Sequence, residues 1–134
     1  MSFDTYLTCV DHGKVCRFPR SIVEEAFAPF IESKSEGSWK LVDSLADVWI
    51  GAGPEVTGFG VSRPPGDKQH PFWRALLEIM QKTQTVFFWI DGGAVVAHLD
   101  VIPHMPPDML ESLGTPALAT EPGDFWDYIQ GTGA

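Results

Sequence analysis

Two short segments near the N-terminus, residues 3–10 and 15–18, are rich in aromatic, β-branched and other apolar residues. Such a composition is typical of β-strands. The few residues between the segments include Gly13, and glycine readily takes the positive φ that a tight turn needs. The pattern predicts a β-hairpin whose register places Cys9 opposite Cys16.

A helical pattern follows this hairpin, with apolar residues at helical spacing over residues 22–31. Ser21 and Glu24 match a capping box, in which a hydroxyl and a carboxylate satisfy free backbone amides at a helix start. A proline in the last turn lacks an amide donor, so the helix should end near Ile31. The polar residues 32–38 are predicted to form a loop.

The central part of the chain alternates between strand-like and helical patterns. A broad apolar stripe that begins at Pro71 predicts the second main helix. Five segments bounded by turn residues have strand-like composition: residues 39–42, 45–50, 56–62, 85–90 and 94–99. The last two should form a second hairpin with its turn at residues 91–93.

The C-terminal part predicts only short elements. Residues 106–114 combine early prolines, acids and a final glycine, which is typical of a short helix. Aromatic residues at 125–129 predict one more helical turn, and residues 131–134 should fray. The whole pattern predicts one α+β domain over residues 1–134. Its antiparallel or mixed sheet would carry two main helices on one face and short helices at the C-terminus.

Composition supports an ordinary globular domain and excludes several classes of protein. The 134 residues are 44% hydrophobic and 20% charged, enough apolar surface for one core. The opening residues lack the basic and apolar regions of a secretory signal, which predicts a cytoplasmic location. No apolar run approaches the roughly 20 residues that a membrane span requires. We therefore expect a soluble protein.

Charge is distributed unevenly along the chain. The formal net charge is −9, which repels nucleic-acid phosphates and anionic lipid, so neither is an expected partner. Residues 83–134 hold seven acids and no lysine or arginine. This asymmetry indicates a cationic partner.

Cys9, His12 and Cys16 form the first cluster with metal-binding chemistry, because thiolates and imidazole suit zinc. The cluster lacks a fourth ligand, so we predict an ordinary hairpin without a metal ion. A disulfide between opposed strands is the third interpretation. In a reducing cytosol both thiols should stay free.

His98, Asp100 and His104 are the best candidates for catalysis, as a general base held by a carboxylate or as metal ligands. The spacing alone is a weak signal, because such residues are common at exposed strand ends. The chain has no complete dinucleotide fingerprint, Walker lysine or nucleophile signature. No cofactor is expected, and binding is favoured over catalysis.

The tryptophans divide into two groups. Four lie in predicted strands or a helix, where core packing is expected: Trp39, Trp49, Trp73 and Trp89. Trp126 lies in a tail segment where aromatics alternate with acids, a composition suited to anchoring a basic partner. Docking of that tail onto its own core is the alternative.

The chain resembles the small cognate immunity proteins of bacterial polymorphic toxins, including type VI secretion effectors. The resemblance rests on the opening residues 1–7, on residues 60–65 and on the base-free acidic C-terminal part. It implies a protein that covers the active site of a toxin, with carboxylates set against basic toxin residues. No functional residue of a family can be transferred.

These observations predict an inhibitor that binds a basic toxin through an acidic C-terminal surface. The expected contact residues are Asp100, Asp108, Glu111, Glu121, Asp124, Trp126, Asp127 and Tyr128. A small hydrolase-like enzyme that uses the histidines and a non-catalytic adaptor are the alternatives. The sequence leaves a homodimer open.

Overall fold

The computed structural model describes residues 4–89 and 93–130 and confirms the α+β class, with 35% helix and 34% strand. The chain runs through β1 (Asp4–Asp11), β2 (Lys14–Val15), β3 (Phe18–Pro19), α1 (Arg20–Phe27), η1 (Ala28–Phe30), β4 (Ile31–Ser35), β5 (Ser38–Leu41), β6 (Asp47–Ile50), β7 (Glu55–Val56), β8 (Gly58–Ser62), α2 (Pro71–Lys82), β9 (Thr85–Trp89), β10 (Ala94–Val96), η2 (Leu99–His104), α3 (Pro107–Leu113), β11 (Ala117–Leu118) and α4 (Pro122–Ile129).

One large sheet organises the molecule, with the strand order β11-β10-β9-β1-β8-β6-β5-β4 and β2 paired to β1. Its pairs among the described residues are antiparallel, except for the parallel pair of β10 and β11. The N-terminal β1 lies in the middle, between β8 and β9. Within the described ranges, no helix combines the length and apolar character needed to cross a bilayer.

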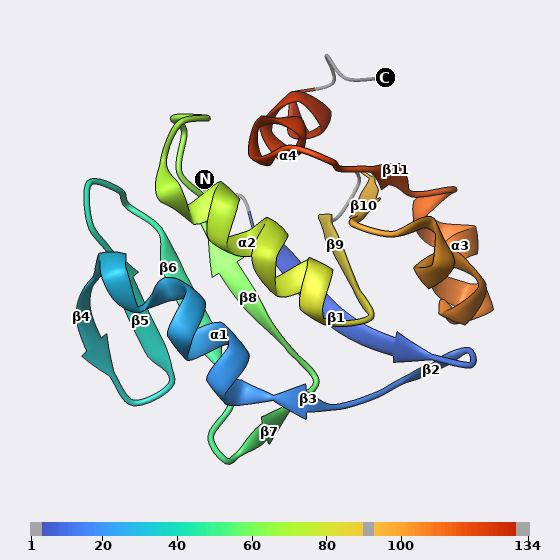
Figure 1. Cartoon of the computed structure of the whole chain (residues 1–134), viewed down its shortest axis with the longest axis horizontal. Helices are drawn as coiled ribbons and strands as arrows, with labels where there is room; N and C mark the ends of the chain where they lie inside the picture. The colour runs from blue at the N-terminus through green and yellow to red at the C-terminus, as the bar shows by residue number, and fades with distance from the viewer. Residues whose placement is uncertain (1–3, 90–92, 131–134) are drawn as a thin grey trace.

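Three helices cover one face of the sheet. Figure 1 shows α1 and α2 in front of the sheet, with α4 near one end of α2. Their apolar stripes meet the inward side chains of alternate strand residues, as the period of two along a strand requires. Phe27 and Phe72 stack between α1 and α2, with ring centroids 5.5 Å apart. Phe125 of α4 packs against Trp73 and Phe87 in the same core.

The two main helices, α1 and α2, lie on one face as predicted, and the opposite face is only partly covered, by η2 and α3. A second core cluster joins η2 and α3 to β1, β9 and β10 through Val10, Val86, Ala94, Val96, Val101 and Met105. This cluster contains no residue of β5, β6 or β8. Among the described residues, half of this face therefore lacks a helical cover.

Several predicted elements are confirmed. The first hairpin turns at His12 and Gly13, both with positive φ, and its register sets Cys9 opposite Cys16. Helix α2 begins at Pro71, and α3 ends before Gly114, which has φ +78°. Strands β9 and β10 pair as expected. Residues 91 and 92 of the second turn, and the tail predicted to fray at 131–134, lie outside the described residues.

The start of α1 and the segment after it differ from prediction. The N-cap is Pro19, which is extended because its ψ is 129°, and Glu24 forms an ion pair with Arg20 instead of capping. Ser21 therefore lies inside the helix. The predicted loop at 32–38 contains β4, an edge strand that pairs with β5. Its polar character has a physical reason, because neither face of an exposed edge strand needs apolar residues.

Candidate functional site

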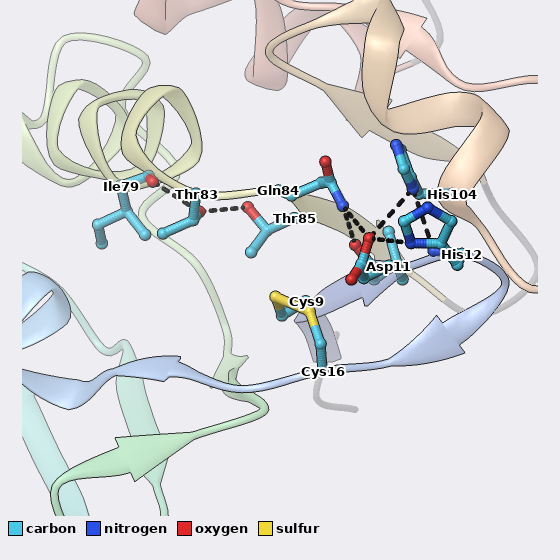
Figure 2. Close-up of a disulfide and its surroundings, with 10 residues drawn as sticks. Cys9, Asp11, His12, Cys16, Ile79, Thr83, Gln84, Thr85 and His104 are labelled. Atoms are coloured by element: carbon cyan, nitrogen blue, oxygen red, sulfur yellow. Dashed lines mark hydrogen bonds and ion pairs between the residues drawn. A yellow bond between two sulfur atoms is a disulfide. The ribbon is translucent and has the colours of Figure 1, made fainter.

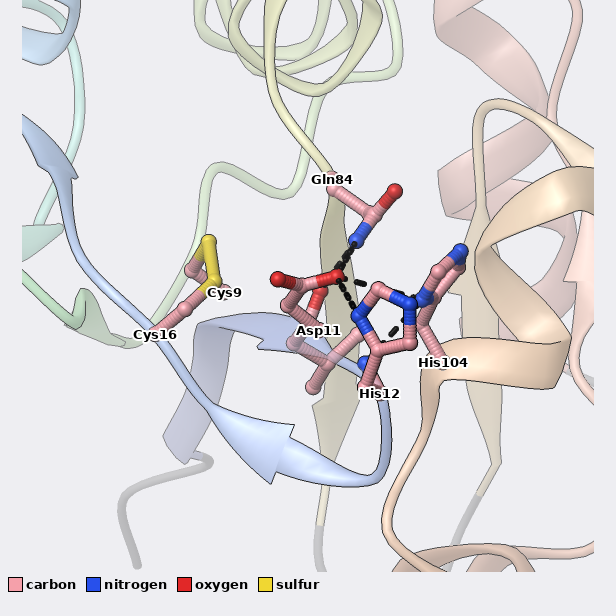
Figure 3. A network of polar contacts seen from close by, with 7 residues as sticks. Cys9, Asp11, His12, Cys16, Gln84 and His104 are labelled. Atoms are coloured by element: carbon pink, nitrogen blue, oxygen red, sulfur yellow. Dashed lines mark hydrogen bonds and ion pairs between the residues drawn. A yellow bond between two sulfur atoms is a disulfide. The ribbon is translucent and has the colours of Figure 1, made fainter.

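A cluster of one carboxylate and two imidazoles lies where the β1–β2 turn meets η2. Asp11 ends β1, His12 begins the turn, and His104 ends η2. Asp11 Oδ1 lies 2.7 Å from His12 Nδ1 and 3.3 Å from His104 Nδ1. Figure 3 shows the three side chains pointing toward one another. Donor atoms from all three lie within 4.8 Å of each other.

Backbone contacts hold the hairpin turn against η2. The His12 amide donates to His104 Nδ1 at 3.0 Å, and the Gly13 amide donates to the His104 carbonyl at 2.9 Å. The side-chain amide of Gln84 donates to the Val10 carbonyl at 2.7 Å and to Asp11 Oδ1 at 3.2 Å. These bonds position the imidazole of His104, which is only partly exposed, beside the carboxylate.

The neighbouring cysteines are joined, so the prediction of free thiols differs from the structure. Cys9 and Cys16 form a disulfide (Figure 2), and their Cα atoms lie 5.1 Å apart. The hairpin register brings the two residues within bridging distance, and the Cys16 amide donates to the Cys9 carbonyl at 2.9 Å. With both sulfurs in this bond, the cysteines are not thiolate ligands for zinc.

The three residues considered for catalysis do not converge. His98 Nε2 lies 3.2 Å from the Gln81 carbonyl, Asp100 is exposed, and His104 contacts Asp11 and His12 instead. Among the described residues, the one group of three or more potential metal ligands is Asp11, His12 and His104. The sequence could not reveal this group, because its members are separated by 92 positions in the chain.

The predicted acidic contact residues divide into two sets according to their internal partners. Asp100, Asp108 and Glu111 on η2 and α3 are exposed and make no hydrogen bond or ion pair with another described residue. Glu121 and Asp124 form a reciprocal capping box at the start of α4. The Asp124 carboxylate also accepts from the Thr120 amide at 2.9 Å.

The remaining predicted contact residues of α4 are engaged with the rest of the fold. Asp127 lies 3.2 Å from Lys68 Nζ in an ion pair, and the Tyr128 hydroxyl donates to the Leu118 carbonyl at 3.0 Å. Trp126 is half-buried and packs against the main core. It also lines a mostly apolar cleft of about 400 Å³ with Arg63, Pro64, Gly66, Trp73, Ile129 and Gln130.

A second cleft, of about 430 Å³, lies between α4 and the start of α2. Its lining includes the bases Lys68 and Arg74 and the acids Glu121, Asp124 and Asp127. The acids of α4 are therefore faced by bases from earlier in the chain. This arrangement makes the surface of α4 less acidic than its own sequence predicts.

A row of aromatic side chains runs from the second core cluster onto the uncovered half of the sheet. Strand register aligns Phe88, Tyr6, Gly60 and Trp49 across β9, β1, β8 and β6. Tyr6 stacks on Phe88 with centroids 5.5 Å apart. Trp49 is 40% exposed, so the prediction that it lies in the core is wrong. It packs over Gly60, where an added Cβ would lie 2.7 Å from the indole.

Comparisons with protein-family models, curated proteins and solved structures find no match to this chain. The described residues themselves must therefore support any functional assignment.

Proposed function

We propose that this protein is an inhibitor of the immunity-protein kind, which binds a basic bacterial toxin and covers its active site. One observation carries the proposal: Asp100, Asp108 and Glu111 are exposed acids with no hydrogen bond or ion pair to another described residue, and residues 83–134, to which they belong, contain no lysine or arginine. Like-charged groups in one region repel each other and weaken the folded state. A cationic partner would turn that repulsion into favourable interaction energy.

The aromatic row gives this surface an apolar part. Because η2 and α3 pack on the same sheet face as Phe88, they lie on the face of the sheet that also carries Tyr6 and Trp49. Interfaces commonly combine a central aromatic anchor with a polar rim. We infer that Trp49 supplies the anchor and that the carboxylates steer the approach of the toxin.

This assignment moves the centre of the proposed surface from α4 to η2 and α3. Reversing the charge of Asp124 would also remove a helix cap, which typically stabilises a protein by about 1 kcal/mol. A binding defect in that variant could therefore come either from the lost helix cap or from the lost negative charge. Asp108 and Glu111 accept no hydrogen bond from another described residue, and Asp108 only adds a favourable charge to the first turn of α3, so they give the cleaner test.

The proposal predicts a loss of protection when these acids are reversed. The toxin domain encoded beside this gene should arrest growth of a bacterial host, and the wild-type inhibitor should restore it. The Asp108→Lys/Glu111→Lys variant should protect poorly, because the new cations repel the basic partner. Growth curves at equal inhibitor levels measure the effect.

The matched control is Glu32→Lys/Glu36→Lys, which makes the same change in net charge at two exposed acids in the β4–β5 hairpin. It should protect as well as wild type. Equal protection by both double variants would contradict the proposed surface. A neighbouring gene whose product is not toxic would contradict the immunity function itself.

We further propose that the inhibitor acts in the cytoplasm, and the thiol state tests this location. A reducing cytosol would open the bond between Cys9 and Cys16, although the folded hairpin brings the two together. Protein alkylated during lysis should therefore carry two labelled cysteines. Unlabelled cysteines would place the protein in an oxidising compartment. A lysate treated with reductant before labelling provides the fully labelled reference.

A further inference from the structure

We propose that Asp11, His12 and His104 form a binding site for a divalent transition-metal cation, of which Zn²⁺ is the best fit. The three residues supply one carboxylate oxygen and two imidazole nitrogens at the junction of the β1–β2 turn with η2. This inference does not depend on the proposed inhibitor function.

The donor spacing fits a small ion. In a tetrahedral zinc site with bonds of about 2.0–2.1 Å, neighbouring donor atoms lie roughly 3.4 Å apart. Asp11 Oδ1 is 2.7 Å from His12 Nδ1 and 3.3 Å from His104 Nδ1, and the whole set lies within 4.8 Å. Small rotations of the exposed His12 side chain would bring the donors to a common centre.

The contacts of His104 place two acceptor atoms, its own Nδ1 and Asp11 Oδ1, close to each other. Its Nδ1 accepts the His12 amide hydrogen, so it presents a lone pair on that side. Asp11 Oδ1, a second acceptor, lies 3.3 Å away. A proton on His104 Nδ1 would form a hydrogen bond to the Asp11 carboxylate, but it would clash with the hydrogen of the His12 amide. A metal ion between the two acceptors would relieve their repulsion, and the His12 amide at the exposed turn would then bond water.

The ligand types select the class of cation. Imidazole nitrogen with a carboxylate suits zinc and similar transition ions, whereas calcium and magnesium prefer oxygen-only sites. Three protein ligands would leave one coordination position for water. Gln84 supports the site from outside, because its amide holds Asp11 Oδ1 at 3.2 Å.

Metal binding would join two parts of the fold that are far apart in sequence. His12 belongs to the hairpin turn, and His104 follows it by 92 residues at the end of η2. A ligand that binds the folded state and not the unfolded chain stabilises the protein. Zinc should therefore raise the melting temperature and hold the turn against η2.

The test is a titration of chelator-treated, disulfide-intact protein with Zn²⁺ alone, followed by competition with a chromogenic chelator and by thermal unfolding. We expect one equivalent of zinc per chain and a higher melting temperature. His12→Ala should weaken binding at least about tenfold, the range seen when the supports of a metal site are removed. Asp11→Asn should do the same, because it keeps the shape of the side chain and removes its charge.

His12→Ala is the decisive variant, because its side chain is 82% exposed and its removal leaves the Gly13 amide bonded to the His104 carbonyl. His98→Ala is the matched control, because it removes another exposed histidine away from the cluster. It should bind zinc like wild type. A Cys9→Ser/Cys16→Ser variant should also retain binding, which separates this site from a thiolate site.

Three outcomes would overturn the proposal. Wild-type protein could fail to bind zinc, His12→Ala and Asp11→Asn could both bind it unchanged, or His98→Ala could weaken binding as much as His12→Ala. Circular dichroism of each metal-free variant checks that a loss of affinity does not come from unfolding.

Discussion

Replacing Trp73 with alanine is expected to lower the free energy of unfolding by about 3–5 kcal/mol, the range for removing a large buried aromatic. Trp73 is completely buried in α2, between the rings of Phe72 and Phe125. Its indole N–H also donates to the Asp67 carbonyl at 3.2 Å. The truncation would leave a cavity and an unsatisfied acceptor. Urea unfolding measures the loss.

Trp49→Ala is the natural comparison, because it makes the same chemical change on the exposed side of the sheet. Its side chain is 40% exposed and rests on Gly60. We expect it to lower the free energy of unfolding far less than Trp73→Ala, as surface substitutions usually do. A similar decrease in the free energy of unfolding for the two variants would contradict the burial of Trp73 between α2 and the sheet.

Gly58→Ala should be still more damaging and should prevent stable folding or remove at least about 3 kcal/mol of stability. A Cβ at Gly58 would lie 1.7 Å from the Leu7 carbonyl oxygen and 2.8 Å from its carbon. Both atoms belong to the backbone of β1, which pairs with β8 in the middle of the sheet. Relief would require the two strands to separate. Denaturant unfolding of the purified variant, or its failure to fold, reports the effect.

Gly60→Ala provides the control two positions along the same strand. There the added Cβ would lie 2.7 Å from an atom of the Trp49 ring, which is a half-exposed side chain and can rotate away. We expect a smaller loss of stability, since no backbone must move. If Gly58→Ala were tolerated as well as Gly60→Ala, the close approach of β1 and β8 would be refuted.

Local sequence patterns predicted the helices and strands that bury one face in the core. The apolar stripe beginning at Pro71 correctly predicted α2, and the strand-like composition before Gly13 correctly predicted β1, because both patterns reflect burial. The edge strand β4 was missed, since exposed residues carry no such periodicity. Trp49 was assigned to the core because it is a large apolar residue in a predicted strand, but it lies on the uncovered face of the sheet.

The candidate sites depended on contacts that a sequence pattern cannot show. His12 and His104 meet only because the hairpin turn rests on η2. The acids of the C-terminal part looked equivalent along the chain. In the fold, Asp124 caps a helix and Asp127 pairs with Lys68, whereas Asp108 has no hydrogen bond or ion pair to another residue that the structure describes.

The association rate with the neighbouring toxin domain, measured at a series of salt concentrations, tests the central claim most directly. Wild-type protein should associate fast at low salt and more slowly as salt screens the attraction. Asp108→Lys/Glu111→Lys should associate slowly with a flattened salt dependence, while Glu32→Lys/Glu36→Lys should follow wild type. An Asp108→Lys/Glu111→Lys variant with the wild-type rate and salt dependence would contradict an acidic docking surface on η2 and α3.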